Sequence, residues 1–254
     1  MPQEGVRGRL LASPAMAEEV VQGTLAFVGG GEWTPLSAGL DRALLERAGG
    51  APVVVIPTAA AFAGPTKVET AAAECFRALG AEVVVIDALH REEAEDKDLV
   101  APVRDARFIY IADGSPLHLR SVLKDSALFK AIRGAWRDGA VLAASGAGAT
   151  LLADPMVDPR GGAYTVGFGL VTDLAVFPHH GSAPAHLLER SLELLPRRAF
   201  LAGVDDHTAL VREADGTWRV VGDGWVTVYT HTDGSVATQI GSYAADSVID
   251  TLSM

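Results

Sequence analysis

Short runs of apolar residues recur along the first half of the chain, and amphipathic segments separate them. Each run is apolar throughout rather than alternating with polar residues, which indicates a strand that is buried on both faces. Such strands belong to a parallel sheet that has helices on both faces and right-handed crossovers. The pattern therefore predicts an α/β fold built on a largely parallel sheet. The runs are TLAFV (24–28), VVVI (53–56), EVVVI (82–86), RFIYI (107–111) and AVLAA (140–144).

The pattern changes in the last third of the chain. After a helix predicted at 184–195, five short apolar runs follow one another closely, with Asp-Gly dipeptides between them. Asp-Gly favours a type I′ hairpin turn, because both central residues of that turn need positive φ. We therefore expect a C-terminal antiparallel hairpin extension of the sheet, packed by Trp218 and Trp225. The dipeptides are Asp215-Gly216, Asp223-Gly224 and Asp233-Gly234.

Composition limits the classes of protein to consider. The chain has 254 residues, of which 49% are hydrophobic, and its formal net charge is −11. No linker-like stretch interrupts its middle, so we expect one α/β domain over residues 23–254, preceded by a flexible N-terminal arm at 1–22. The negative charge argues against a nucleic-acid partner and against an anionic membrane surface, since both require clustered Lys and Arg.

The single cysteine, Cys75, excludes an intrachain disulfide and a cysteine-based metal site. No segment is apolar over a length that would suit a signal peptide or a membrane span. We therefore expect a cytoplasmic protein that requires neither a cofactor nor a metal.

Six small residues, from Ala144 to Ala149, join a buried strand to the next helix. In a nucleophile elbow the reactive residue sits in a strained turn, and its neighbours must be small so that strand and helix can pass closely. The stretch predicts such a turn and places the reaction site there. From these residues alone, a tight turn without chemistry remains the alternative.

Two further glycine turns follow predicted strands. Gly29-Gly30-Gly31 precedes Glu32 and could cradle a phosphate, but Thr34 stands where the dinucleotide fingerprint has its third glycine. A tight turn that fixes Glu32 is the favoured interpretation. The turn at 112–115 contains Asp113 and Gly114 and could direct a backbone N–H at a substrate oxygen, although an ordinary turn is the alternative.

One histidine is placed to act as a base. His179 lies in Phe177-Pro178-His179-His180, which follows the short apolar run at 174–176, and would lie at the same edge of the sheet as the elbow. The remaining candidates lack that placement, and we expect them to face solvent: His118, His186, His207 and His231.

The two glycine turns, the small-residue elbow and His179, in this order, resemble the peptidase S51 family. That family comprises peptidase E, which is an aspartyl dipeptidase, and cyanophycinase. The resemblance runs from about residue 24 to 212; it includes Asp154-Pro155-Met156 after the elbow and Val204-Asp205-Asp206-His207-Thr208-Ala209-Leu210-Val211, where the family has Ile/Val-Asp-Glu-x-Thr-Ala-Leu-Val. It implies a class I glutamine-amidotransferase-like fold, one peptidase S51-like domain over 23–254, a small peptide or amino-acid-derived ligand, and a homodimer.

The family elbow reads Gly-(Ser/Thr)-Ser-Ala-Gly-Ala, and a gapless match places its second serine, the nucleophile, at Gly146. His179 matches the family's base, and the oxyanion donors would be the N–H of Ala147 and one from Asp113 or Gly114. The resemblance therefore implies a hydrolytically disabled or repurposed homologue, in which Gly146→Ser would restore reactivity.

Several alternatives stay open at this point. The elbow could be shifted by one residue, giving an active serine peptidase on Asp-containing peptides with Ser145 as nucleophile. The acidic member of the triad could be Asp154 or Asp158. A serine-to-glycine exchange made to trap substrate would give the same sequence. The family cleaves beside Asp, which implies a basic pocket, but no Lys or Arg can be assigned to one.

Overall fold

The computed structural model of the chain describes residues 22–232 and 234–252. The expected arm at 1–22 lies outside the described residues except for its last position. Among the described helices, none combines the length and the apolar character that a membrane crossing requires.

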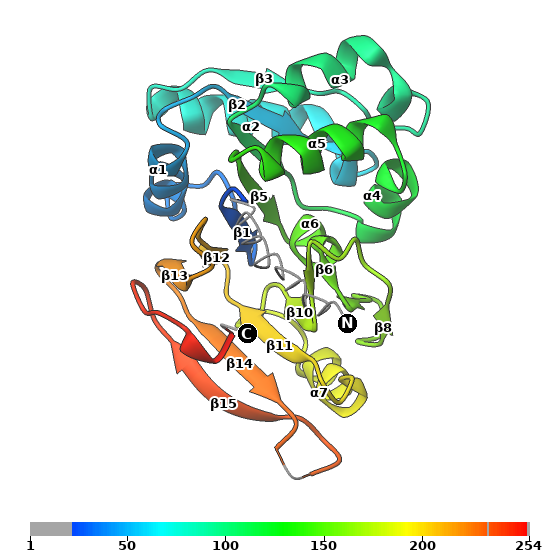
Figure 1. Ribbon diagram of the computed structural model, residues 1–254, viewed down its shortest axis with the longest axis vertical. Coiled ribbons are helices and arrows are strands. Elements are labelled where there is room, and N and C mark those ends of the chain that lie inside the picture. The colour runs from blue at the N-terminus through cyan, green and yellow to red at the C-terminus, as the bar shows by residue number, and fades with distance from the viewer. Residues whose placement is uncertain (1–21, 233, 253–254) are drawn as a thin grey trace, which may run out of the picture.

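A seven-stranded sheet forms the centre of the molecule, in the order β13-β12-β1-β5-β4-β2-β3 (Figure 1). The five strands from β1 to β3 in that order pair in parallel, whereas β12 is antiparallel to both β1 and β13. The prediction of an α/β fold on a largely parallel sheet is confirmed. The strands are β1 (Leu25–Val28), β2 (Val53–Ile56), β3 (Val83–Val85), β4 (Phe108–Ile111), β5 (Val141–Ser145), β12 (Thr208–Arg212) and β13 (Trp218–Gly222).

Helices cover both faces of this sheet because alternate strand residues point to opposite sides. Leu25 and Phe27 of β1 pack in one buried cluster with residues of α3, α4, α5 and α6, whereas Ala26 and Val28 pack in a second cluster with α1 and α2. Burying one large apolar side chain stabilises the fold by about 1.5–3 kcal/mol. The helices are α1 (Ala38–Arg47), α2 (Pro65–Ala78), α3 (Lys97–Arg104), α4 (Pro116–Leu123), α5 (Ala127–Arg137) and α6 (Ala147–Leu152).

A second, six-stranded sheet lies beside the first, in the order β15-β14-β11-β10-β6-β9 (Figure 1). Helix α7 (Ala185–Leu194) connects β10 to β11, which pair in parallel. Its strands are β6 (Ala153–Asp154), β9 (Val171–Thr172), β10 (Leu174–Phe177), β11 (Phe200–Val204), β14 (Val226–Thr230) and β15 (Thr238–Tyr243). A short antiparallel pair, β7 (Met156–Val157) and β8 (Tyr164–Thr165), and the 3-10 turns Thr58–Ala60, Glu93–Glu95 and Asp250–Leu252 complete the fold.

The C-terminal antiparallel extension is present, but it is divided between the two sheets. The Asp215-Gly216 turn joins β12 to β13 in the central sheet, while β14 and β15 pair in the second. Asp223-Gly224 lies between β13 of the central sheet and β14 of the second sheet, and so it does not form a hairpin. A turn dipeptide favours a local reversal of the chain, but it does not determine which strand the next segment pairs with. Trp218 is buried and stacks on Phe27 with ring centroids 6.2 Å apart. The predicted packing of Trp225 is wrong, because its side chain is 51% exposed.

Candidate active site

The elbow lies between β5 and α6. Gly146 links Ser145, the last residue of β5, to Ala147, the first of α6, with φ 44° and ψ −100°. L-residues adopt that backbone only under strain, whereas glycine does so at little cost. Two positions further on, a Cβ added to Gly148 would lie 2.9 Å from the Cβ of Ala144, so strand and helix pass too closely for larger residues.

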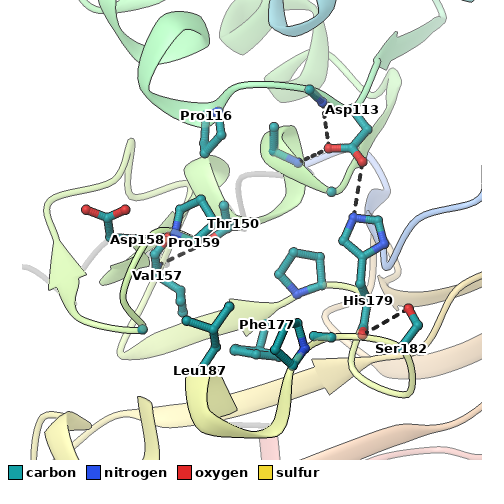
Figure 2. Close-up of a pocket in the computed structure, with 17 residues that line it drawn as sticks. Asp113, Pro116, Thr150, Val157, Asp158, Pro159, Phe177, His179, Ser182 and Leu187 are labelled. Carbon is teal, nitrogen blue, oxygen red and sulfur yellow. Dashed lines mark hydrogen bonds and ion pairs between the residues drawn. The ribbon is translucent and has the colours of Figure 1, made fainter. Parts of the chain in front are cut away.

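The carboxylate of Asp113 fills the space above this elbow. Its Oδ1 accepts the N–H of Ala147 at 2.7 Å and that of Gly114 at 2.6 Å, while Oδ2 lies 3.1 Å from Nε2 of His179 (Figure 2). A Cβ added to Gly146 would lie 2.0 Å from Oδ1. A side chain at position 146 and the Asp113 carboxylate therefore compete for the same space.

Asp113 is ionised at neutral pH. Burial would raise its pKa, but hydrogen bonds from His179 and from the N–H groups of Ala147 and Gly114 outweigh burial and hold the pKa below its usual value. The resemblance implies these two N–H groups as candidate oxyanion donors, and a fixed anion already occupies the space between them.

His179 lies between two carboxylates. Its Nδ1 is 2.7 Å from Oδ1 of Asp206, and its Nε2 faces Asp113. The hydrogen bond with Asp113 is the largest influence on the ring; burial opposes it, Asp206 adds to it, and the pKa of His179 is raised to about 9. The ring is therefore an imidazolium at neutral pH and donates to both carboxylates. We call Asp113, His179 and Asp206 the acid–histidine–acid triad.

The glycine turn after β1 positions this triad. Glu32 accepts the backbone N–H of Asp113 at 3.0 Å with Oε1 and the hydroxyl of Ser145 at 2.7 Å with Oε2. A Cβ added to Gly30 would lie 2.2 Å from Cε1 of the His179 ring. Glycine is needed there because the histidine packs directly against the backbone, so the turn is structural.

The side chain of Ser145 is directed to Glu32. Its side chain is completely buried, and its hydroxyl donates to Glu32 rather than contacting His179. Side chains alternate along β5, and a residue directly before the elbow therefore faces the opposite side from the turn.

The acidic partner of His179 is Asp206, which the sequence pattern did not single out. Asp154 instead accepts the N–H of Gly167 at 3.0 Å, and Asp158 pairs with Arg160 at 2.6 Å, so neither contacts the triad. The matched 204–211 segment held the signal, because Asp206 stands where the family sequence has Glu.

Three of the four histidines that were expected to face solvent differ from that expectation. Each is partly buried, and one ring nitrogen lies within hydrogen-bonding distance of a backbone carbonyl: His118 with Leu89 at 2.8 Å, His207 with Gly31 at 2.9 Å and His231 with Leu195 at 2.8 Å. His186 is exposed. The backbone carbonyls in need of a donor could not be identified without the fold.

A cavity of about 390 Å³ opens beside the triad (Figure 2). Asp113, His179 and the elbow form one end, and its other walls are mainly apolar, with Val157, Phe177 and Leu187. In the described part of the chain no Lys or Arg lines it, and no cluster of His, Cys, Asp or Glu side chains is arranged to hold a metal ion. The site offers an anion, a cation and an apolar chamber.

The family model for peptidase family S51 matches residues 25–220, so the chain belongs to the peptidase S51 family. Similar curated proteins include the cyanophycinase of Nostoc sp. (strain PCC 7120 / SAG 25.82 / UTEX 2576), which is 26% identical over 245 residues, covering 92% of this chain and 80% of that protein. The cyanophycinase of Geminocystis herdmanii (strain PCC 6308) is also 26% identical, covering 90% of this chain and 88% of its own length.

Among solved structures, a peptidase from an acI-B1 Actinobacterium superposes with a TM-score of 0.78 at 28% identity, covering 91% of this chain and 98% of its own. A putative peptidase E protein from Listeria monocytogenes EGD-e gives a TM-score of 0.58 at 18% identity, covering 83% and 100%, which supports the fold alone. The chain is thus peptidase E- and cyanophycinase-like.

The charge of the triad gives a direct test by NMR titration. The His179 ring is expected to titrate near pH 9, and Asp113→Asn should lower that pKa because it removes the largest cause of the shift. A raised histidine pKa stabilises the fold fully below about pH 6.5, and this contribution disappears as the pH rises through 9. The fall in unfolding free energy over that window should be smaller in Asp113→Asn, whereas Asp154→Asn should behave like the parent.

Proposed function

We propose that this chain is a peptidase E- and cyanophycinase-like protein that has lost serine acylation and uses the S51 pocket for another purpose. A single observation carries the proposal: the group between His179 Nε2 and the N–H of Ala147 is the carboxylate of Asp113, and no hydroxyl occupies that place. Without a hydroxyl at position 146, the acyl-enzyme of a serine peptidase does not form.

The Asp113 carboxylate is a poor substitute for serine in peptide hydrolysis. Its attack on an amide would produce a mixed anhydride and expel an amine, and the tetrahedral intermediate would return to the amide because carboxylate is the better leaving group. The negative charge of Asp113 would also repel the developing oxyanion from the N–H of Ala147 and Gly114. Peptide cleavage in the manner of the family is therefore disfavoured twice.

The pocket supports a small ligand that is largely uncharged. Relatives of this chain are named cyanophycinases, and the family resemblance implies a peptide or amino-acid-derived ligand. The basic wall that an aspartyl substrate would need is missing from the described lining, which is mainly apolar and includes Val157, Phe177 and Leu187. We expect an apolar group of the ligand to occupy this chamber.

The second candidate function is an active serine peptidase that uses Ser145. It would require the buried hydroxyl to leave Glu32 and to reach His179 from the other face of β5. We therefore favour the loss of serine acylation over a peptidase that uses Ser145. The homodimer and the cytoplasmic location stay predictions.

A fluorophosphonate probe and a set of Asp-containing dipeptides separate the two functions. We expect no covalent labelling and no dipeptide cleavage by the parent protein, and the same result for Ser145→Ala. A known serine hydrolase in the same reaction serves as the positive control. Labelling of the parent that Ser145→Ala abolishes would establish the Ser145 peptidase and exclude our proposal.

A further inference from the structure

The acid–histidine–acid triad contains the three groups that a different covalent reaction needs. We propose that Asp113 is the catalytic nucleophile of a hydrolysis at saturated carbon, in which His179 activates water and Asp206 positions His179, and that the substrate is an uncharged, apolar alkyl halide. This inference rests on the proposed function, because it takes the serine chemistry to be absent.

The two oxygens of Asp113 are held for two different tasks. Oδ1 lies between the N–H groups of Ala147 and Gly114, at 2.7 and 2.6 Å, where charge on the carbonyl oxygen of an ester would be stabilised. Oδ2 faces the ring of His179 at 3.1 Å, and Asp113 forms part of the cavity wall. Figure 2 shows the carboxylate at one end of the chamber, with His179 below it.

Saturated carbon is the electrophile that suits a carboxylate. A lone pair on Oδ2 forms a bond to carbon while the carbon–halogen bond breaks, and the halide leaves with the bonding pair. The product is an alkyl ester of Asp113, which, unlike an anhydride, is stable enough to accumulate. No oxidant or reductant is needed.

Water then cleaves the ester. Its proton passes to Nε2 of His179 and its oxygen bonds to Cγ of Asp113. The electron pair of the carbonyl π bond moves onto Oδ1, which lies between the two N–H groups. The pair returns, the bond from Cγ to Oδ2 breaks, and the alcohol leaves with the proton from His179. The free acid ionises and returns its proton to His179, so the net reaction converts halide and water into alcohol, a proton and a halide ion.

The charge of the triad orders these steps. The hydrogen bond with the Asp113 carboxylate is the largest cause of the raised pKa of His179, so the resting ring is charged and is not a base. Esterification removes that negative charge, the pKa of His179 falls, and its proton passes to solvent. The ring therefore becomes a base only when there is an ester to hydrolyse.

The cavity restricts the substrate to an apolar chain with a weakly basic leaving group. Its walls offer Val157, Phe177 and Leu187 to an alkyl group. The other carboxyl group at the wall, Asp158, has its pKa lowered by the Arg160 guanidinium, so it is ionised and cannot protonate a leaving group. The His179 imidazolium lies 3.1 Å from the attacking Oδ2, on the opposite side of the carbon from the leaving group in an in-line displacement, so it does not protonate that group either. Halide needs no such proton, in contrast to an alkoxide or an amine.

The test uses butyl, hexyl and octyl bromide with the parent, His179→Gln and Asp113→Asn proteins, each checked by thermal melting. The parent should release bromide over many turnovers, and His179→Gln should accumulate an alkyl ester that peptide mass mapping places on Asp113. Asp113→Asn should form no adduct there and should release bromide at least about 100-fold more slowly. In a single turnover in water enriched in heavy oxygen, the label should enter the Asp113 carboxyl group.

Failure of this inference is separable from failure of the proposed function. No Asp113 adduct with any of the three bromides, or an adduct only on another residue such as Cys75, overturns the nucleophile. An Asp113 ester that persists equally in the parent overturns the role of His179. Either result leaves the absence of fluorophosphonate labelling intact, whereas labelling of the parent would remove the proposed function itself.

Discussion

The double variant Asp113→Gly/Gly146→Ser is expected to react covalently with a fluorophosphonate, although the parent and both single variants do not. The two exchanges must be made together because a Cβ at position 146 would lie 2.0 Å from Oδ1 of Asp113. Removing the carboxylate frees the N–H of Ala147 for an oxyanion and leaves Nε2 of His179 for the new hydroxyl. The sequence alone predicted that Gly146→Ser would suffice, and the position of Asp113 argues against it.

The measurement is the mass of the labelled protein over time, with peptide mapping to Ser at position 146. Backbone strain is the main risk, since a serine at φ 44° costs on the order of 1–3 kcal/mol, and each variant is therefore compared with the parent by thermal melting. A folded double variant that stays unlabelled would mean that the elbow does not present its side chain to His179. Labelling of Gly146→Ser alone would show that Asp113 moves aside readily.

The pattern of apolar residues predicted most of the fold, because the burial of strands and helices determines both that pattern and the arrangement of the layers. The five apolar runs that indicated buried parallel strands each coincide with or overlap a strand of the central sheet, from β1 to β5. The pairing of the last strands could not be obtained in this way. Asp223-Gly224 has the same local signal as Asp215-Gly216, yet the chain changes sheets at the first and forms a hairpin at the second.

The candidate site could be predicted only in part from the sequence, because the contact between Asp113 and the N–H of Ala147 joins two separate turns. The small residues around Gly146 predicted the elbow. The proximity of His179 was predicted because both segments follow strands and were expected at the same edge of the sheet. Nothing local to residues 112–115 indicates that the Asp113 side chain crosses to the elbow 34 positions away, at Ala147. Asp206 was likewise missed because its partner, His179, is 27 positions away in the chain.

The departures from the family pattern at the two turns are complementary. The resemblance implies a serine at position 146, where this chain has glycine, and a glycine-rich turn around position 113, where it has an aspartate. The Asp113 carboxylate fills the space that a side chain at position 146 would take. It contacts His179 and the N–H of Ala147, which the resemblance implies as base and oxyanion donor. A loss of function without replacement would leave His179 facing an empty elbow. The observed exchange instead keeps a carboxylate opposite the histidine. Because we propose this carboxylate as a nucleophile, the exchange favours our proposal of a repurposed site over a disabled one.

In the double variant, Asp206→Asn is expected to lower the rate of fluorophosphonate labelling by about 10³–10⁴-fold. The carboxylate of Asp206 accepts from Nδ1 of His179 at 2.7 Å, and this hydrogen bond leaves Nε2 free to act as the base. An amide in its place can donate to Nδ1 and so select the wrong tautomer. The parent offers an independent readout, because Asp206→Asn should also lower the pKa of His179 from about 9.

Asp154→Asn in the same double variant is the matched control. Asp154 is one of the carboxylates that the sequence suggested as the acidic member of the triad. The side-chain carbonyl oxygen of the new asparagine can still accept the N–H of Gly167. The labelling rate should therefore remain near that of the double variant. If Asp154→Asn slowed labelling as much as Asp206→Asn, the loss would reflect general disturbance of the fold. If Asp206→Asn had no effect on the rate or on the pKa of His179, Asp206 would not orient the histidine, and the triad would reduce to Asp113 and His179.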